Sequence, residues 1–360
     1  MNSTPAADGY RMPGEFEPHS GCYMVWPQRP DNWREDAGPA QEAFAAVAEA
    51  ITASDPVTML ASPEQFGRAR AALSPAIKVV EAVSNDSWAR DIGPTFVVDD
   101  NGGRRAVDWI FNAWGGHDGG LYTPWDDDDL IAARIAELEG ADRYRAPFVL
   151  EGGAIHVDGQ GTVITTAECL LNANRNPSLN KAQIEAGLRD YLGVESIIWL
   201  DRGVFEDETD GHVDNLIHFV APGVVVITWM GDESHPQHAR SVAALDLLRA
   251  ARDANGRELD IHLLPAPGPL RMTAAEAAGV TAAAGSQPRR EGDDLAGSYA
   301  NFYIGTSRVV VPLLDERTDD EALAVIAGLF GDRDVIGVPG REILLGGGNI
   351  HCITQQVPAV

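Results

Sequence analysis

The strongest constraint on the fold is a recurring unit of two short apolar segments joined by a tight turn. Asn101-Gly102 and Asp158-Gly159 separate two such pairs, and these dipeptides favour hairpins because the turn requires positive φ. We predict four strand pairs, at residues 93–98 with 106–111, 153–157 with 162–166, 212–220 with 224–229, and 299–304 with 309–313. Residues 348–354 repeat only the first half of the unit, and residues 21–26 are a candidate partner strand.

Helical segments are predicted between the strand pairs, which places the chain in the α/β class. They are residues 39–51, 126–138, 178–192, 237–253 and 319–329. Ser178 is a candidate N-cap of the third helix and Gly193 its candidate C-cap. Residues 274–297 lack a clear period, so we predict that they are partly a loop.

Each predicted unit opens with a side chain that can carry chemistry. These residues are Asp91, Glu151, His212, Asn301 and Cys352. If the units pack around a common axis, all five openings meet, which predicts a radial, propeller-like layout with a central site. The 360 residues alone would suggest roughly two domains. We nevertheless predict one catalytic domain over residues 1–360, with about the first ten residues flexible.

Charge and cysteine content exclude several classes of protein. The net charge is −27, which opposes binding to nucleic acid or anionic lipid and would attract a small cation. Three cysteines without a CxxC motif fit a reducing compartment and disfavour a thiolate zinc site. The first residues contain no apolar stretch typical of a secretory signal, and no apolar run is long enough to span a membrane. We therefore expect a soluble cytoplasmic protein.

Cys352 is the candidate nucleophile because it follows Gly346-Gly347-Gly348-Asn349, a stretch that allows a ligand close to the backbone. A thiolate attacks well once nearby positive charge lowers its pKa. The alternative is a buried apolar cysteine, which we also expect for Cys22 and Cys169.

His212 and Asp214 lie two residues apart, so a strand would place both on one face. A histidine near a thiolate can transfer protons near neutral pH. The alternatives are a hydrogen-bonded core histidine and, with His235 as third ligand, a metal site. Upstream, Glu208 belongs to an acidic cluster that is otherwise expected to be a solvated loop.

Further carboxylates precede other strands. Asp91 and Trp88 stand together, and Glu151 precedes Gly152-Gly153. A carboxylate accepts two parallel N–H bonds from a planar cation, and an aromatic face can stack on it. Core packing of Trp88, a local ion pair of Asp91 with Arg90, and a capping or surface role of Glu151 are the alternatives. Several acids around one thiol fit a guanidinium or amidinium substrate, whose charge would neutralise them.

The chain resembles the agmatine deiminase family of guanidine-modifying enzymes, or penteins. The matching stretches are residues 12–19, 85–94, 111–116, 151–159, 165–177, 211–215, 265–270, 298–304 and 346–356. The resemblance implies a five-bladed pseudo-symmetric α/β propeller with a central active site. It implies hydrolysis of agmatine to N-carbamoylputrescine and ammonia in polyamine (putrescine) biosynthesis, without metal or cofactor, and a homodimer or larger assembly.

The resemblance also implies roles for individual residues. Cys352 corresponds to the nucleophile, Asp91 and Asp214 to the carboxylates that hold the guanidinium, and Glu151 with His212 to the remaining catalytic pair. The positions implied to bind substrate are Trp88, Asp91, Glu208, Asp214, Gly348 and Asn349.

One residue departs from the family pattern, because His117 stands where lysine is expected. Arg90 is a candidate carboxylate clamp, as in related amino-acid deiminases. Deimination of arginine or peptidyl-arginine, and polyamine binding without turnover, are the alternative functions.

Overall fold

The computed structural model describes residues 3–360, and within this range the strands form five small mixed sheets. Four sheets contain an antiparallel pair followed by a third strand parallel to the second. Their strands are β4 (Thr95–Val98), β5 (Arg104–Ile110), β6 (Arg143–Val149), β7 (Ile155–Val157), β8 (Thr162–Thr166), β9 (Ser196–Leu200), β10 (Ile217–Ala221), β11 (Val224–Trp229), β12 (Asp260–Pro265), β13 (Tyr303–Ile304), β14 (Arg308–Leu313) and β15 (Asp334–Pro339). The four predicted strand pairs are confirmed, although their first strands are shorter than predicted. The third strands are additional.

A helix connects the second strand of each sheet to the third, because parallel neighbours need a long crossover connection. These helices are α1 (Gly38–Thr52), α5 (Ile131–Leu138), α7 (Lys181–Leu192), α8 (Pro236–Ala250) and α10 (Asp319–Leu329). All five correspond to predicted helices. In α7 the N-cap is Asn180, not the predicted Ser178, since Asn180 and Gln183 form a capping box. Gly193 ends this helix at φ 67°, as predicted.

The fifth sheet joins segments from opposite ends of the sequence. Its order is β16 (Gln355–Pro358), β1 (His19–Val25), β2 (Val57–Ala61) and β3 (Lys78–Glu81). β16 pairs antiparallel with β1, so the half unit near residue 350 finds its partner strand near residue 21, as predicted. The remaining short elements are η1 (Ala6–Asp8), α2 (Pro63–Ala72), α3 (Ala89–Ile92), α4 (Gly116–Gly119), η2 (Asp128–Leu130), η3 (Gly152–Ala154), α6 (Ala167–Leu170), η4 (Val213–Asn215), α9 (Ala274–Ala278) and α11 (Arg341–Leu344).

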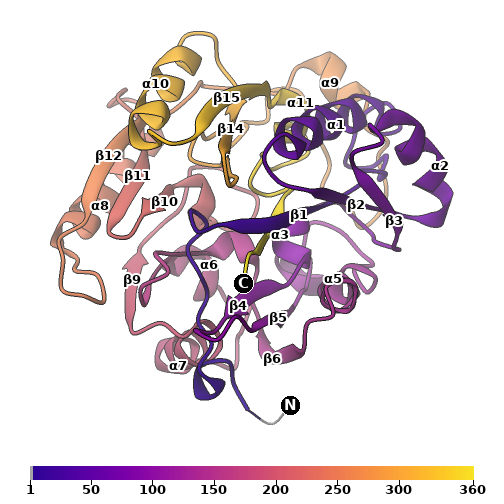
Figure 1. Ribbon diagram of the computed structural model, residues 1–360. Coiled ribbons are helices and arrows are strands. Elements are labelled where there is room, and N and C mark those ends of the chain that lie inside the picture. The colour runs from indigo at the N-terminus through magenta and orange to yellow at the C-terminus, as the bar shows by residue number, and fades with distance from the viewer. Residues whose placement is uncertain (1–2) are drawn as a thin grey trace.

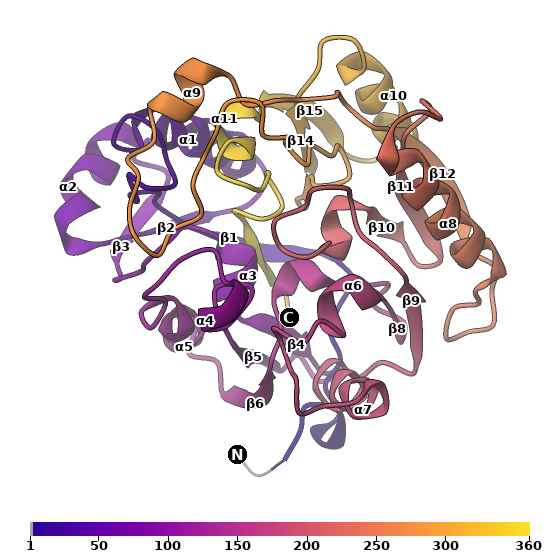
Figure 2. The same ribbon diagram turned by 180° about the vertical axis from the view of Figure 1, so that it is seen from behind.

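The five sheets surround a common centre, and the crossover helices lie on the outside (Figure 1). This is the expected five-bladed pseudo-symmetric α/β propeller. Each helix buries an apolar stripe; in α7 this stripe is Ile184, Leu188 and Leu192, all fully buried. Full burial stabilises each such side chain by about 1.5–3 kcal/mol. Seen from behind, the segment after α9 runs over the face that also carries α4 (Figure 2).

The chemistry-bearing residues lie in short helical turns that precede the first strands, not in the strands. Asp91 belongs to α3, and Asp214 belongs to η4. The prediction that His212 and Asp214 share one face of a strand is therefore wrong. His212 caps a 3-10 turn, which still directs both side chains toward the centre because the turn is too short to separate them.

Of residues 1–10, expected to be flexible, Met1 and Asn2 lie outside the described residues. From Ser3 on, the segment contacts the β4–β5–β6 sheet. The Asp8 carboxylate accepts hydrogen bonds from the Ser3 hydroxyl at 2.8 Å and from the Tyr144 hydroxyl on β6 at 2.6 Å. The flexibility of this segment stays a prediction. Among residues 3–360, no helix has the length and apolarity needed to cross a membrane.

Candidate active site

The five residues at the unit openings meet at the centre of the propeller. Cys352 Sγ lies 3.2 Å from Asn301 Nδ2 and 3.7 Å from Asp214 Oδ2. His212 lies between two other carboxylates: Nδ1 is 3.8 Å from Asp91 Oδ2, and Nε2 is 3.7 Å from Glu151 Oε2. The structure thus brings together all five catalytic candidates, each from a different unit except His212 and Asp214.

Two glycines permit this close approach. A Cβ on Gly153 would stand 2.5 Å from His212 Nδ1, and the Gly153 N–H donates to Asp91 Oδ1 at 2.9 Å. A Cβ on Gly348 would stand 2.4 Å from the Trp88 ring and 3.1 Å from Cys352 Cβ. Side chains at either position would displace the candidate catalytic groups, which explains why the sequence has glycine there.

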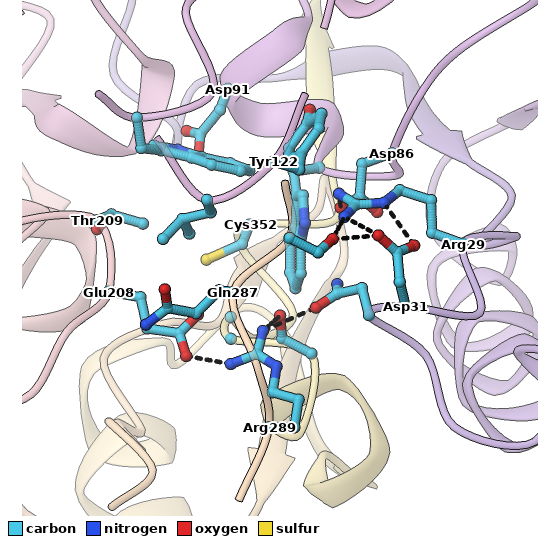
Figure 3. Close-up of a pocket in the computed structure, with 18 of the residues that line it drawn as sticks. Arg29, Asp31, Asp86, Asp91, Tyr122, Glu208, Thr209, Gln287, Arg289 and Cys352 are labelled. Atoms are coloured by element: carbon cyan, nitrogen blue, oxygen red, sulfur yellow. Dashed lines mark hydrogen bonds and ion pairs between the residues drawn. The ribbon is translucent and has the colours of Figure 1, made fainter. Parts of the chain in front are cut away.

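A cavity of about 500 Å³ leads to the sulfur (Figure 3). Trp88, Gly348 and Glu208 line it, as predicted for substrate-binding positions, together with Asp91, His212 and Cys352. Asp214 and Asn349 do not belong to the wall that the described residues form. Asp214 lies behind it, 3.7 Å from Cys352 Sγ, and Asn349 Oδ1 accepts the Ile350 N–H at 3.0 Å. Their substrate-binding roles stay predictions.

The environment of Cys352 opposes a thiolate in the empty site. Burial raises the pKa of the Cys352 thiol well above its usual value, and the Asp214 and Asp91 carboxylates raise it further. A cation between the sulfur and these carboxylates would reverse this effect. The site therefore favours the nucleophile only when a positive ligand is bound.

The surroundings of His212 favour its protonated, positively charged form. Burial opposes its protonation, but the nearby Asp91 and Glu151 carboxylates raise the pKa of His212 well above its usual value. A buried imidazolium beside a thiol is suited to giving a proton to a leaving group. Burial, followed by the neighbouring Asp214 and Glu151 charges, also raises the pKa of Asp91 to about 6.

Several buried polar atoms around the sulfur have no hydrogen-bond partner among residues 3–360. They are Asp214 Oδ1, Glu151 Oε2, Glu208 Oε2 and His212 Nε2. An unpartnered buried acceptor costs about 1–3 kcal/mol, so such a group is expected to receive a donor from a ligand. Glu151 Oε2 and His212 Nε2 face each other at 3.7 Å. Asp214 Oδ1 and Glu208 Oε2 remain as carboxylate oxygens that fit a ligand with N–H donors.

Arg175 holds Glu151 in place, a contact that the sequence pattern did not indicate. Its Nε lies 2.7 Å from Glu151 Oε1, and both side chains are fully buried. Burial alone would raise the pKa of Glu151, but the Arg175 guanidinium lowers it to about 2. Glu151 thus stays ionised beside His212.

Replacing Arg175 with methionine is expected to destabilise the fold by about 3–5 kcal/mol, because the Glu151 charge would remain buried without its partner. Urea denaturation measures the loss. The double variant R175M/E151Q should recover part of it. The matched control is Arg134→Met, which breaks an exposed pair with Glu137 and should cost under about 1 kcal/mol. A loss below about 1 kcal/mol for Arg175→Met would contradict this account.

The far wall of the cavity contains a second arginine that the sequence pattern did not indicate. Arg289 pairs with Glu208 and donates to Asn32 Oδ1 and the Gly346 carbonyl, each at 2.7 Å. It belongs to residues 274–297, which were predicted to be partly loop because they lack periodicity. The only sequence signal was an arginine within that stretch.

The other candidates lie away from the cavity. Arg90 is buried against Glu15, with Nη1 3.2 Å from Oε1, so it is not a carboxylate clamp in the cavity wall. His117 packs against Trp125, with ring centroids 4.8 Å apart and the ring planes tilted by 49°. His235 caps α8 by accepting the Gln237 N–H at 3.1 Å, and it does not group with His212.

Two groups of described residues have the side-chain types of metal ligands. One group is Glu15, His156, His218 and His351, and the other is Glu151, Cys169 and His212. In each group a guanidinium already contacts the carboxylate, Arg90 in the first and Arg175 in the second. These arginines supply the positive charge that a metal ion would bring.

The fold and the site together define the class: a five-bladed α/β propeller whose central cavity joins a thiol, an imidazole and carboxylates, as in guanidine-modifying hydrolases. A model of the Porphyromonas-type peptidyl-arginine deiminase family matches residues 11–358, and the chain belongs to this family.

Relatives of known name match along the whole chain. The agmatine deiminase of Stutzerimonas stutzeri is 60% identical over 100% of this chain and 98% of its own length. That of Pseudomonas aeruginosa is 58% identical over 99% and 98%. The solved structure of the Enterococcus faecalis agmatine deiminase superposes with a TM-score of 0.97 at 47% identity, covering 100% of this chain and 98% of that one.

Proposed function

We propose that this chain is an agmatine deiminase, which hydrolyses agmatine to N-carbamoylputrescine and ammonia in putrescine biosynthesis. The full-length similarity to proteins of that name supports the activity. The observation that carries the chemistry is the group of unpartnered carboxylate oxygens beside Cys352. A cytoplasmic location and assembly as a homodimer are part of the proposal, as the family resemblance implies.

The first half-reaction forms a covalent intermediate. Asp91 and Asp214 orient the guanidinium, and its positive charge favours the Cys352 thiolate. The sulfur attacks the central carbon and a C–S bond forms. His212 protonates one terminal nitrogen, the C–N bond breaks, and ammonia leaves. The product on the enzyme is an S-alkylthiouronium.

The second half-reaction returns the enzyme to its starting state. His212, now neutral, removes a proton from water, and the hydroxide attacks the same carbon. The C–S bond breaks, Cys352 leaves as thiolate, and the substituted urea is released. Glu151, fixed by Arg175, keeps the His212 ring oriented through both steps.

Glu208 is proposed to bind the terminal ammonium of agmatine. Arg289 engages Glu208 Oε1, while Oε2 has no partner among residues 3–360 and stays open to the ligand. Trp88 lines the same cavity as this carboxylate and the sulfur and is proposed as an apolar wall for the butyl chain. Agmatine has such an ammonium at one end of its butyl chain and the guanidinium at the other.

The test of the activity is ammonia release from agmatine, arginine and a peptidyl-arginine, with product identification by mass spectrometry. The proposal expects N-carbamoylputrescine and a kcat/KM for agmatine at least about 100-fold above that of the other two. Glu208 would repel the α-carboxylate of arginine, and a peptidyl-arginine has a neutral amide where agmatine has the ammonium that Glu208 would bind. Faster turnover of arginine or peptidyl-arginine would overturn the proposal and indicate a deiminase for that substrate. Binding of agmatine without ammonia release would indicate a polyamine-binding protein.

Replacing Glu208 with glutamine is expected to raise KM for agmatine about 10- to 100-fold, the effect of one charge-assisted bond of 1.5–3 kcal/mol, while kcat changes little. Butylguanidine, which lacks the ammonium, provides the control substrate. Its kcat/KM should be nearly equal in the wild type and the variant. An equal loss on both substrates would show that Glu208 acts elsewhere.

A further inference from the structure

A chain of alternating charges leads to Asp214 beside Cys352 through three residues that the proposed mechanism leaves unused. It begins at Arg90, whose Nη1 lies 3.2 Å from Glu15 Oε1. Glu15 contacts His351 Nε2 at 2.9 Å, and His351 Nδ1 lies 2.8 Å from Asp214 Oδ2. All four side chains are buried. The chain therefore connects a fixed positive charge to the carboxylate nearest the sulfur.

The His351 ring stands between two carboxylates, and each ring nitrogen faces one of them. Both nitrogens can donate only when the ring is an imidazolium. Burial and the Arg90 charge oppose this state, but Glu15 and Asp214 raise the pKa of His351 above its usual value. With His351 protonated, the charges of the four groups alternate in sign and sum to zero.

Two other histidines face Glu15, and burial favours the neutral form of both. His156 Nε2 lies 3.9 Å and His218 Nε2 3.7 Å from the Glu15 carboxylate. Burial lowers the pKa of His156 to about 4 and that of His218 well below its usual value. Within residues 3–360, neither ring forms a hydrogen bond with Asp214; His218 Nδ1 lies 2.9 Å from the Ala300 carbonyl. The proton of this cluster therefore resides on His351.

Asp214 is bound asymmetrically by this chain. Oδ2 accepts from His351 and faces Cys352 Sγ at 3.7 Å, whereas Oδ1 has no partner among residues 3–360. A neutral Asp214 would hold a guanidinium more weakly through Oδ1, because the attraction between opposite charges would be lost. Burial of Asp214 disfavours the ionised form, so a positive group must offset it.

We propose that His351 is a positioning residue whose imidazolium, anchored by Glu15 and Arg90, keeps Asp214 ionised and turned toward the substrate. The role rests on the proposed function, since its importance lies in holding a guanidinium against Cys352. His351 does not touch the cavity itself. It acts through Asp214, while its other ring nitrogen is held by Glu15.

The experiment compares the pH dependence of kcat/KM for agmatine in the wild type with that of His351→Gln and Glu15→Gln. His351→Gln removes one positive charge beside the coupled carboxylates, so their pKa values rise together. The midpoint of the acid limb of its kcat/KM profile should move to higher pH by at least about one unit. Below this midpoint, kcat/KM should fall about tenfold, and the difference should become smaller as the pH rises. Glu15→Gln removes the carboxylate that stabilises the imidazolium and tests this anchor, but it also removes a negative charge, so its shift should be smaller than that of His351→Gln. The control is His218→Gln, which removes a buried ring of the same cluster while leaving the His351–Asp214 bond. It should lower the melting temperature without moving the limb.

A second measurement observes the protonation of the His351 ring directly. In ¹⁵N-histidine-labelled Cys352→Ser protein, NMR should show two buried histidines with both ring nitrogens protonated at pH 7.5, His212 and His351, and one of these two signals should be lost in folded His351→Gln. A uniform loss of activity at all pH values in His351→Gln, or a neutral His351 ring, would overturn the inference. If the wild type does not turn over agmatine, the proposed function fails, whereas the NMR result still decides the state of His351.

Discussion

Cys352→Ser is expected to release ammonia from agmatine at least about 10³-fold more slowly than the wild type, because a hydroxyl in this setting cannot replace a thiolate as nucleophile. The carboxylates that hold the guanidinium remain, so the variant should still bind agmatine. Binding at 100 times Kd would stabilise the folded protein by about 2.7 kcal/mol, which a thermal-shift titration detects. A continuous ammonia assay measures the rate.

The control for this substitution is Cys22→Ala, which removes another buried thiol outside the cavity wall. It should retain activity within a few fold. Turnover by Cys352→Ser at the wild-type rate would refute the covalent mechanism. Loss of agmatine binding together with activity would instead mean that the substitution disturbs the carboxylate cluster, which circular dichroism and the melting temperature would report.

His212→Asn is expected to lower kcat about 10²- to 10⁴-fold, the usual contribution of a positioned acid and base. KM should change less, because Asp91 and Asp214 still hold the substrate. The surface variant His262→Asn, on β12, is the matched control and should behave as the wild type. Initial rates over a pH series measure both constants. A loss below about tenfold would show that another group transfers the proton.

The strand pairs were predictable because the residues that indicate them are neighbours in the sequence. Each has a turn dipeptide between two apolar runs, as at Asp158-Gly159, and both strands are buried. The third strands carry no such signal. β6 has the burial pattern of alternating exposed and buried residues and contains two arginines, while β12 and β15 begin with aspartate and end with proline. Their partner lies across a helix, so no turn marks them.

The candidate site also contains residues that could be predicted from the sequence and residues that could not. Cys352, His212 and the carboxylates were identifiable because their residue types carry chemistry and recur at the unit openings. Their supporting partners were not, since the pairing is spatial: Glu151 bonds Arg175 across 24 residues and Glu208 bonds Arg289 across 81. The function of His351 was equally hidden, because its partner Glu15 lies 336 residues away.

The pairing of β16 with β1 has a consequence for how this protein acquires activity. Ser20 on β1 and Val357 on β16 are 337 residues apart, so the ribosome must have made almost all of the described chain before that sheet can form. Cys352 lies immediately before β16 and is positioned by it. A nascent chain therefore contains Asp91, Glu151 and Asp214 before it contains Cys352, the proposed nucleophile. The sheet that includes β16 can be completed only after Cys352 has been made.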